Sequence, residues 1–116
     1  MGGWAQGYLV ALGLTLLIEV PVYAGGLAAL CGVRPVAGVA GGAVVNLVSH
    51  PLSFLIVLPL LQPRLGYWPA LALIEAAVWP GEALLLYAWL RRDLGVLLGL
   101  SFVANGLSLG IGLLLP

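Results

Sequence analysis

Four long apolar runs, separated by only three short breaks, make up almost all of this chain of 116 residues. A helix needs about 20 apolar residues to cross the hydrocarbon core of a bilayer, and each run reaches that length. The runs lack the strict alternation of transmembrane β-strands, so helices are the spanning structure that remains. We therefore predict one transmembrane domain of the all-α class, a polytopic four-helix bundle with helices over residues 6–31, 36–61, 69–90 and 94–115.

The composition excludes several classes of protein. Hydrophobic residues make up 63% of the chain and charged residues only 7%, whereas about 25% is usual in soluble domains. The four basic and four acidic residues balance, and no basic stripe is present, so we expect no nucleic-acid partner. Cys31 is the only cysteine, which excludes an internal disulfide and a thiolate metal cluster.

The arginines predict the orientation of the bundle. Because the breaks are short, neighbouring helices must run antiparallel, which places Arg34, Arg91 and Arg92 on one side of the membrane and Arg64 on the other. Loops rich in arginine and lysine tend to stay in the cytoplasm. We therefore expect a multi-pass protein of the bacterial cytoplasmic (inner) membrane, with both termini outside.

The two halves of the chain resemble each other. Residues 17–25 (LIEVPVYAG) align with residues 73–81 (LIEAAVWPG), and Asn-Leu-Val-Ser at 46–49 aligns with Asn-Gly-Leu-Ser at 105–108. This predicts two tandem helical hairpins, 6–61 and 69–115, related by a pseudo-twofold axis along the membrane normal. His50 and Glu82 have no polar counterpart in the other half.

Each predicted helix carries one polar stripe. Residues three, four or seven apart lie on one helix face, and at 1.5 Å per residue the stripes reach similar depths near the midplane. His50 and Glu75 share a level and form our first candidate pair. The candidate ion-, proton- or substrate-binding residues are Glu19, Asn46, His50, Glu75, Glu82 and Asn105, supported by Tyr23, Ser49, Ser101 and Ser108.

Carboxylates in these helices need an explanation, because a charged side chain at the bilayer centre costs about 2.5–3.5 kcal/mol. The glutamates must be protonated, paired or hydrated. A protonatable carboxylate beside hydrogen-bonding groups is what proton coupling requires. The alternative is structural, since polar side chains also hold transmembrane helices together.

We predict no resident cofactor, although a metal ion held by His50 and Glu75 stays open. A single histidine is more often a core residue than a ligand, and neither His-Glu-x-x-His nor Glu-x-x-His is present. The chain also shows no activated nucleophile, so an enzyme is the lesser alternative.

Several motifs together resemble a known pattern. Glu19-x-Pro-x-Tyr23, Asn46-Leu-x-Ser-His-Pro51, Glu75 through Glu82 and Ser101-x-x-x-Asn105-x-x-Ser108 are similar to those of small bacterial membrane proteins of four helices with an Asn-Leu-x-[Ser/Thr]-His-Pro motif. This resemblance implies the fold and a membrane location, but no activity.

Our leading hypothesis is transport or conduction of a cation, or of a small solute coupled to protons. Glu75 and His50 would form the outer part of the site and Glu82 the inner part, with Glu19 as a further carrier. The first alternative is an accessory or assembly subunit of a larger membrane complex. The second is an intramembrane enzyme that uses glutamate and histidine for acid-base or metal chemistry. The expected partner is the lipid bilayer, and small glycine surfaces leave a homo-oligomer open.

Overall fold

The structure, a computed structural model, describes residues 3–114, and side chains from residue 6 onward. Its elements are the helices α1 (Gly3–Cys31) and α2 (Pro35–Pro51), the π-helical segment η1 (Leu52–Val57), and the helices α3 (Leu58–Leu65), α4 (Tyr67–Leu90) and α5 (Leu94–Leu114). Because α2, η1 and α3 are continuous, they form one rod. The result is four rods long and apolar enough to cross a membrane, which confirms the predicted all-α class and the four spans.

The second span is longer than predicted. We expected a break over residues 62–68, but α3 continues to Leu65 and α4 begins at Tyr67. Pro63 lies inside α3, where it removes one backbone hydrogen bond without requiring the chain to turn. The turn occurs at Gly66, whose φ of 82° suits a residue without a side chain. The predicted end of the last helix, residue 115, lies outside the described residues.

A widened helical turn follows Pro51 in the middle of the second span. The N–H of Leu58 donates to the carbonyl of Ser53, five residues earlier rather than four. Pro59 explains this, because in an α-helix its ring would clash with the carbonyl of Leu55 and it has no N–H to donate. Single π-helical turns of this kind are often found at functional sites. Here the turn contains the buried Ser53.

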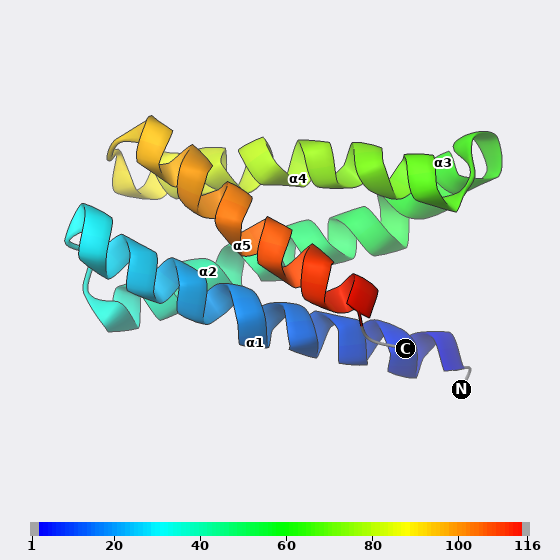
Figure 1. Cartoon of the computed structure of the whole chain (residues 1–116), viewed down its shortest axis with the longest axis horizontal. Coiled ribbons are helices and arrows are strands. Elements are labelled where there is room, and N and C mark those ends of the chain that lie inside the picture. Colours follow the sequence, from blue (N-terminus) through cyan, green and yellow to red (C-terminus); the bar gives the residue numbers. More distant parts are fainter. Residues whose placement is uncertain (1–2, 115–116) are drawn as a thin grey trace.

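Each of the four rods packs against two others, and Figure 1 shows α5 lying across the bundle. Helix α1 packs on α2 and α5, and α4 packs on α5 and on the second span, whereas the backbones of α1 and α4 are not neighbours in the part of the chain that is described. In Figure 1, α5 starts beside α4 and crosses diagonally to end beside α1. Consequently α4 and α5 diverge towards the end of the bundle at which α1 begins.

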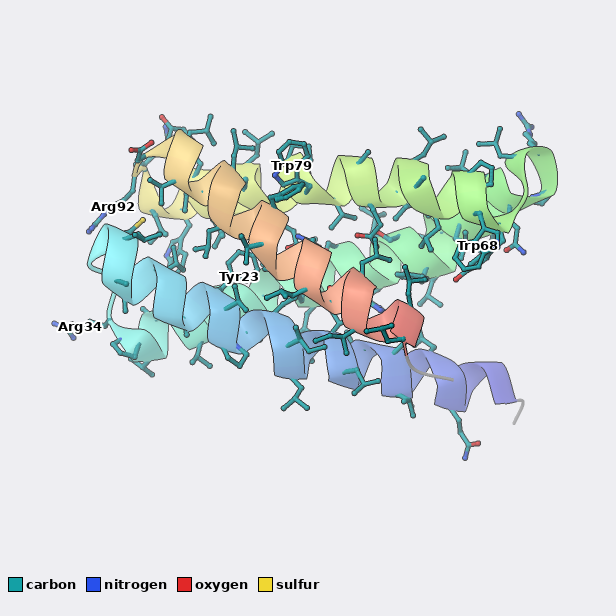
Figure 2. All side chains as sticks on the ribbon, in the orientation of Figure 1. Tyr23, Arg34, Trp68, Trp79 and Arg92 are labelled. Carbon is teal, nitrogen blue, oxygen red and sulfur yellow. The ribbon has the colours of Figure 1, made fainter. Side chains whose placement is uncertain are left out.

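The two ends of the bundle differ in charge. Figure 2 shows Arg34 and Arg92 at one end and Trp68 at the other, with Tyr23 between them. We call these ends the three-arginine end (loops 32–34 and 91–93) and the single-arginine end (the turn at Gly66). At the three-arginine end, Arg92 donates to the carbonyl of Cys31, the last residue of α1. This contact joins the two loops.

Glycines allow α1 and α2 to approach closely. A side-chain carbon added at Gly38 would lie 2.9 Å from the backbone Cα of Ala24, and one at Gly42 would lie 3.1 Å from the Cβ of Tyr23. The contact at Gly38 is too short for a larger residue, and the one at Gly42 would require its neighbours to shift slightly. The spacing of four residues places both glycines on the α1 side of α2, as in small-xxx-small packing of transmembrane helices.

An apolar cluster fills the half of the bundle near the three-arginine end. It contains side chains from all four rods, and its largest members include Tyr23, Leu27, Leu86 and Leu97. The outward faces of the helices carry exposed apolar residues such as Leu17 and Phe102, as expected for lipid-facing surfaces. The polar residues therefore lie inside the bundle, on the other side of this apolar cluster.

Candidate functional site

The carboxylate of Glu82 is the meeting point of all four rods. It lies on α4 and is 1% exposed. Its Oε1 accepts hydrogen bonds from the Tyr23 hydroxyl of α1 at 2.6 Å and from the Asn105 Nδ2 of α5 at 3.0 Å, and its Oε2 accepts one from the Ser49 hydroxyl of α2 at 2.5 Å. Three donors directed at two oxygens suit a carboxylate that only accepts. We call these four residues the Glu82 cluster.

A second set of hydrogen bonds fixes Asn105 within this cluster. Its Nδ2 lies 2.9 Å from the carbonyl and 3.2 Å from the hydroxyl of Ser101, one turn earlier on α5. The Ser101 hydroxyl donates to the carbonyl of Trp79 on α4 at 2.7 Å. Ser101 is fully buried, so these bonds are shielded from water. The Asn105 amide is thereby held in place from both α4 and α5.

Glu19 lies on α1 and is 2% exposed. Its Oε2 accepts a hydrogen bond from the Ser108 hydroxyl of α5. Its Oε1 is buried and has no hydrogen-bond partner among the described residues. A buried acceptor without a donor is costly, and in native proteins it often marks a place where a ligand or water binds.

Glu75 and His50, our first candidate pair, line the same cavity, but no hydrogen bond of the described residues joins them. The His50 ring instead stacks on Phe54 at a centroid distance of 4.6 Å and meets Tyr8 at 5.1 Å. Its Nδ1 is buried and has no partner in the described part of the chain. Glu75 is half-buried.

Asn46 is 1% exposed, and its Nδ2 donates to the carbonyl of Gly42, one turn earlier on α2, at 2.8 Å. It also lines the cavity described below. The Nδ2 of Asn105 makes the equivalent bond to the carbonyl of Ser101. The two asparagines thus have the same local geometry on different rods.

A cavity of about 640 Å³ lies between the rods on the single-arginine side of the Glu82 cluster. Its rim includes Gln6 and Tyr67, which are exposed, and its deep end includes Asn46 and Glu82. Beyond the Glu82 cluster, the apolar cluster fills the bundle. The cavity is therefore open on one side of the polar residues and closed on the other.

The cavity wall is acidic. Glu19, Glu75 and Glu82 all line it, together with His50, and no arginine is among its lining residues. The chain's four arginines lie in or beside the breaks between spans, and it has no lysine. When these carboxylates are ionised, the wall is negative, and their field is strong because the surrounding helices have a low dielectric constant.

The geometry does not form a compact metal site. Among residues 6–114, no group of three or more histidine, cysteine, aspartate or glutamate side chains lies close enough to hold a metal ion. The ligands that a structural or catalytic zinc ion requires are thus not assembled in this arrangement. The cavity is instead of the size and character that bind small organic molecules, mostly apolar with a few convergent polar groups.

Sequence reasoning missed the aromatic side chains near the site. The spacing of four residues between His50 and Phe54 could have indicated their contact, since such residues are neighbours on a helix. Trp79 and Phe102 meet at 5.4 Å between α4 and α5, and nothing in their positions along the chain indicated this pairing. It depends on how the two helices cross.

Comparisons of the chain with protein-family models, with curated proteins and with solved structures found no match. The function is therefore argued from the site alone.

Proposed function

We propose that this protein transports or conducts a cation, or a small solute together with protons, through the central cavity of its membrane bundle. The observation that carries this proposal is the cavity itself, which has three glutamates and neither arginine nor lysine among its lining residues. Ionisable residues inside membrane-spanning helices usually mark the pathway of an ion, a proton or a substrate. A purely structural network would not need a cavity of this size.

The residues divide the pathway into two parts. Glu75 and His50 line the cavity on the single-arginine side of the Glu82 cluster and would receive the cation or solute first. Glu82 would form the inner part of the site, and Glu19, whose Oε1 has no partner among the described residues, would serve as a further proton or cation carrier. Release towards the three-arginine end requires the Glu82 cluster and the apolar cluster beyond it to separate, as alternating access requires.

The distribution of arginines supports an orientation for this pathway. Three of the four arginines lie at one end of the bundle, and the positive-inside bias would place that end in the cytoplasm. The cavity would then open to the outside of a bacterial inner membrane. We also propose that the two halves of the chain are tandem repeats, which the matching hydrogen bonds of Asn46 and Asn105 support.

Currents across a solid-supported membrane test the proposal. Proteoliposomes are exposed to concentration jumps of monovalent inorganic cations and of methylammonium at several pH values. We expect currents for at least one cation, and acid should reduce them because protonation removes the negative charge of the cavity. Glu75→Gln and Glu82→Gln should abolish the pH-dependent current, whereas Asp93→Asn, which alters the one acidic residue outside the cavity, should not.

One observation favours a structural alternative, namely that the Glu82 cluster joins all four rods. If the protein is an accessory subunit, Glu82→Gln should impair folding, Glu75→Gln should have no effect, and no cation should give a current. That combination of results would reject transport.

A further inference from the structure

A groove of about 200 Å³ opens between α4 and α5 and has no equivalent among our sequence-based expectations. It lies where the two helices diverge (Figure 1). Its walls include Trp79 and Phe102, which are 38% and 60% exposed and so face the bilayer. Trp79 is held there by a hydrogen bond from its Nε1 to the carbonyl of Leu98 at 2.7 Å.

The groove adjoins the acidic cavity. Glu75, Asn105 and Leu109 line both. Glu75 is thus the one acidic residue that lines both the cavity and the groove. A molecule with a polar group at Glu75 can place its remainder in the groove, against the Trp79 and Phe102 rings and Gly106.

The unsatisfied groups of the cavity indicate what that polar group is. Glu19 is almost fully buried, and its Oε1 is an acceptor without a donor among the described residues. Glu75 adds a second carboxylate, and neither arginine nor lysine is among the residues that line the cavity. A ligand with N–H donors and a positive charge would supply both the donor that the Glu19 Oε1 lacks and a cationic partner for the carboxylates. Charge-assisted N–H···O bonds are among the strongest hydrogen bonds that a carboxylate makes. A phosphate group is negative like an ionised carboxylate and would be repelled by it.

We infer that this site binds a single-chain primary amine, with its ammonium group among the carboxylates of the cavity and its apolar chain in the groove between α4 and α5. The inference rests on the proposed function and specifies the substrate class of the same site. A phospholipid with an amine head group is not the occupant, because its phosphate would lie beside Glu75. A quaternary ammonium compound has the charge but no N–H donor, so it binds more weakly.

Gly106 provides a sharp test, because a side-chain carbon added there meets no atom within 4 Å. Leucine at this position should fill the groove without displacing backbone. Gly99 is the matched control, since it lies two turns earlier on α5, is equally open and lines neither the cavity nor the groove. Binding of radiolabelled octylamine is measured by equilibrium dialysis against the protein in phosphatidylcholine nanodiscs, with empty nanodiscs subtracted.

We expect saturable binding that Gly106→Leu weakens about fivefold and Glu75→Gln about tenfold. Gly99→Leu should have no effect, and phosphatidylethanolamine added to the nanodiscs should not compete. Octyltrimethylammonium should compete about tenfold less well than unlabelled octylamine, because it lacks N–H donors.

Two results would overturn the inference and leave the proposed function intact. Octylamine binding that depends on Glu75 but not on Gly106 would show that the apolar chain does not lie in the groove. Equal competition by octyltrimethylammonium, or competition by phosphatidylethanolamine, would show that the site is not specific for single-chain primary amines. If neither octylamine nor any cation binds or gives a current, the inference and the proposed function fail together.

Discussion

Replacing Tyr23 by phenylalanine isolates one bond of the Glu82 cluster. The ring is fully buried and its hydroxyl donates to the Glu82 carboxylate at 2.6 Å. Phenylalanine keeps the packing of the ring in the apolar cluster and removes only the donor. The loss in stability therefore measures the hydrogen bond and not a cavity.

Two kinds of measurement on other proteins give the range expected for the free energy of this hydrogen bond. Hydrogen bonds to charged groups contribute about 1.5–3 kcal/mol in soluble proteins. Hydrogen bonds between transmembrane helices average about 0.6 kcal/mol, with a maximum near 1.7. Tyr23 has no exposed surface, Glu82 is 1% exposed and the acceptor is a carboxylate, so the value should lie above the membrane average. We expect Tyr23→Phe to lower the free energy of unfolding by about 2 kcal/mol, or about 30-fold in the unfolding equilibrium.

The assay is reversible unfolding in mixed micelles of dodecyl sulfate and a mild detergent, followed by tryptophan fluorescence. Tyr87→Phe is the control, since Tyr87 is half-buried and its ring, which faces Arg91 at 5.9 Å, is retained. The same substitution of Tyr23 in a Glu82→Gln background should cost less, because an amide replaces the carboxylate acceptor. A loss below about 0.5 kcal/mol, or equal losses in both backgrounds, would refute the assigned bond.

Two further substitutions test the packing and the ends of the helices. Gly38→Ala should destabilise the bundle by about 1–3 kcal/mol, because the new carbon would lie 2.9 Å from the backbone of Ala24. The control, Gly99→Ala, should be neutral or stabilising. Equal unfolding midpoints for the two variants would contradict the close approach of α1 and α2. Asp93→Ala should lower the free energy of unfolding by about 1 kcal/mol, because the Asp93 carboxylate accepts a hydrogen bond from the N–H of Gly95 at 3.0 Å at the start of α5. Asp93→Asn should retain most of this stability. An alanine variant as stable as the parent would show that the cap contributes nothing.

The spans were predictable because hydrophobicity and length act locally along the chain. The four apolar runs form the four rods, and glycines within residues 38–42 lie where α1 and α2 approach closely. The break after residue 61 was placed too early, since Gln62 and Pro63 signal a turn but fit a helix that only Gly66 ends. Local signals thus established where the spans lie better than where each one stops.

The pairing of polar residues was not predictable to the same degree. Depth placed His50 and Glu75 at one level, and both line the cavity, yet hydrogen bonds of the described residues do not join them. Glu82 instead accepts from Tyr23, Ser49 and Asn105. Helical spacing gives the height of a side chain and the face it shares, but its partner depends on the rotation and crossing of the helices. Those are set by packing across the whole bundle.

The charge and the access of the cavity can be measured directly with thiol reagents. In a Cys31→Ala background, cysteines are introduced at Thr15 and Val78, which line the cavity, and at Leu97, which is buried in the apolar cluster. A cationic methanethiosulfonate added from the single-arginine side should modify the first two about tenfold faster than an anionic one and leave Leu97→Cys unmodified. Glu75→Gln should reduce the preference for the cation. Equal rates for both reagents, or no modification at the cavity positions, would contradict an acidic cavity open to that side.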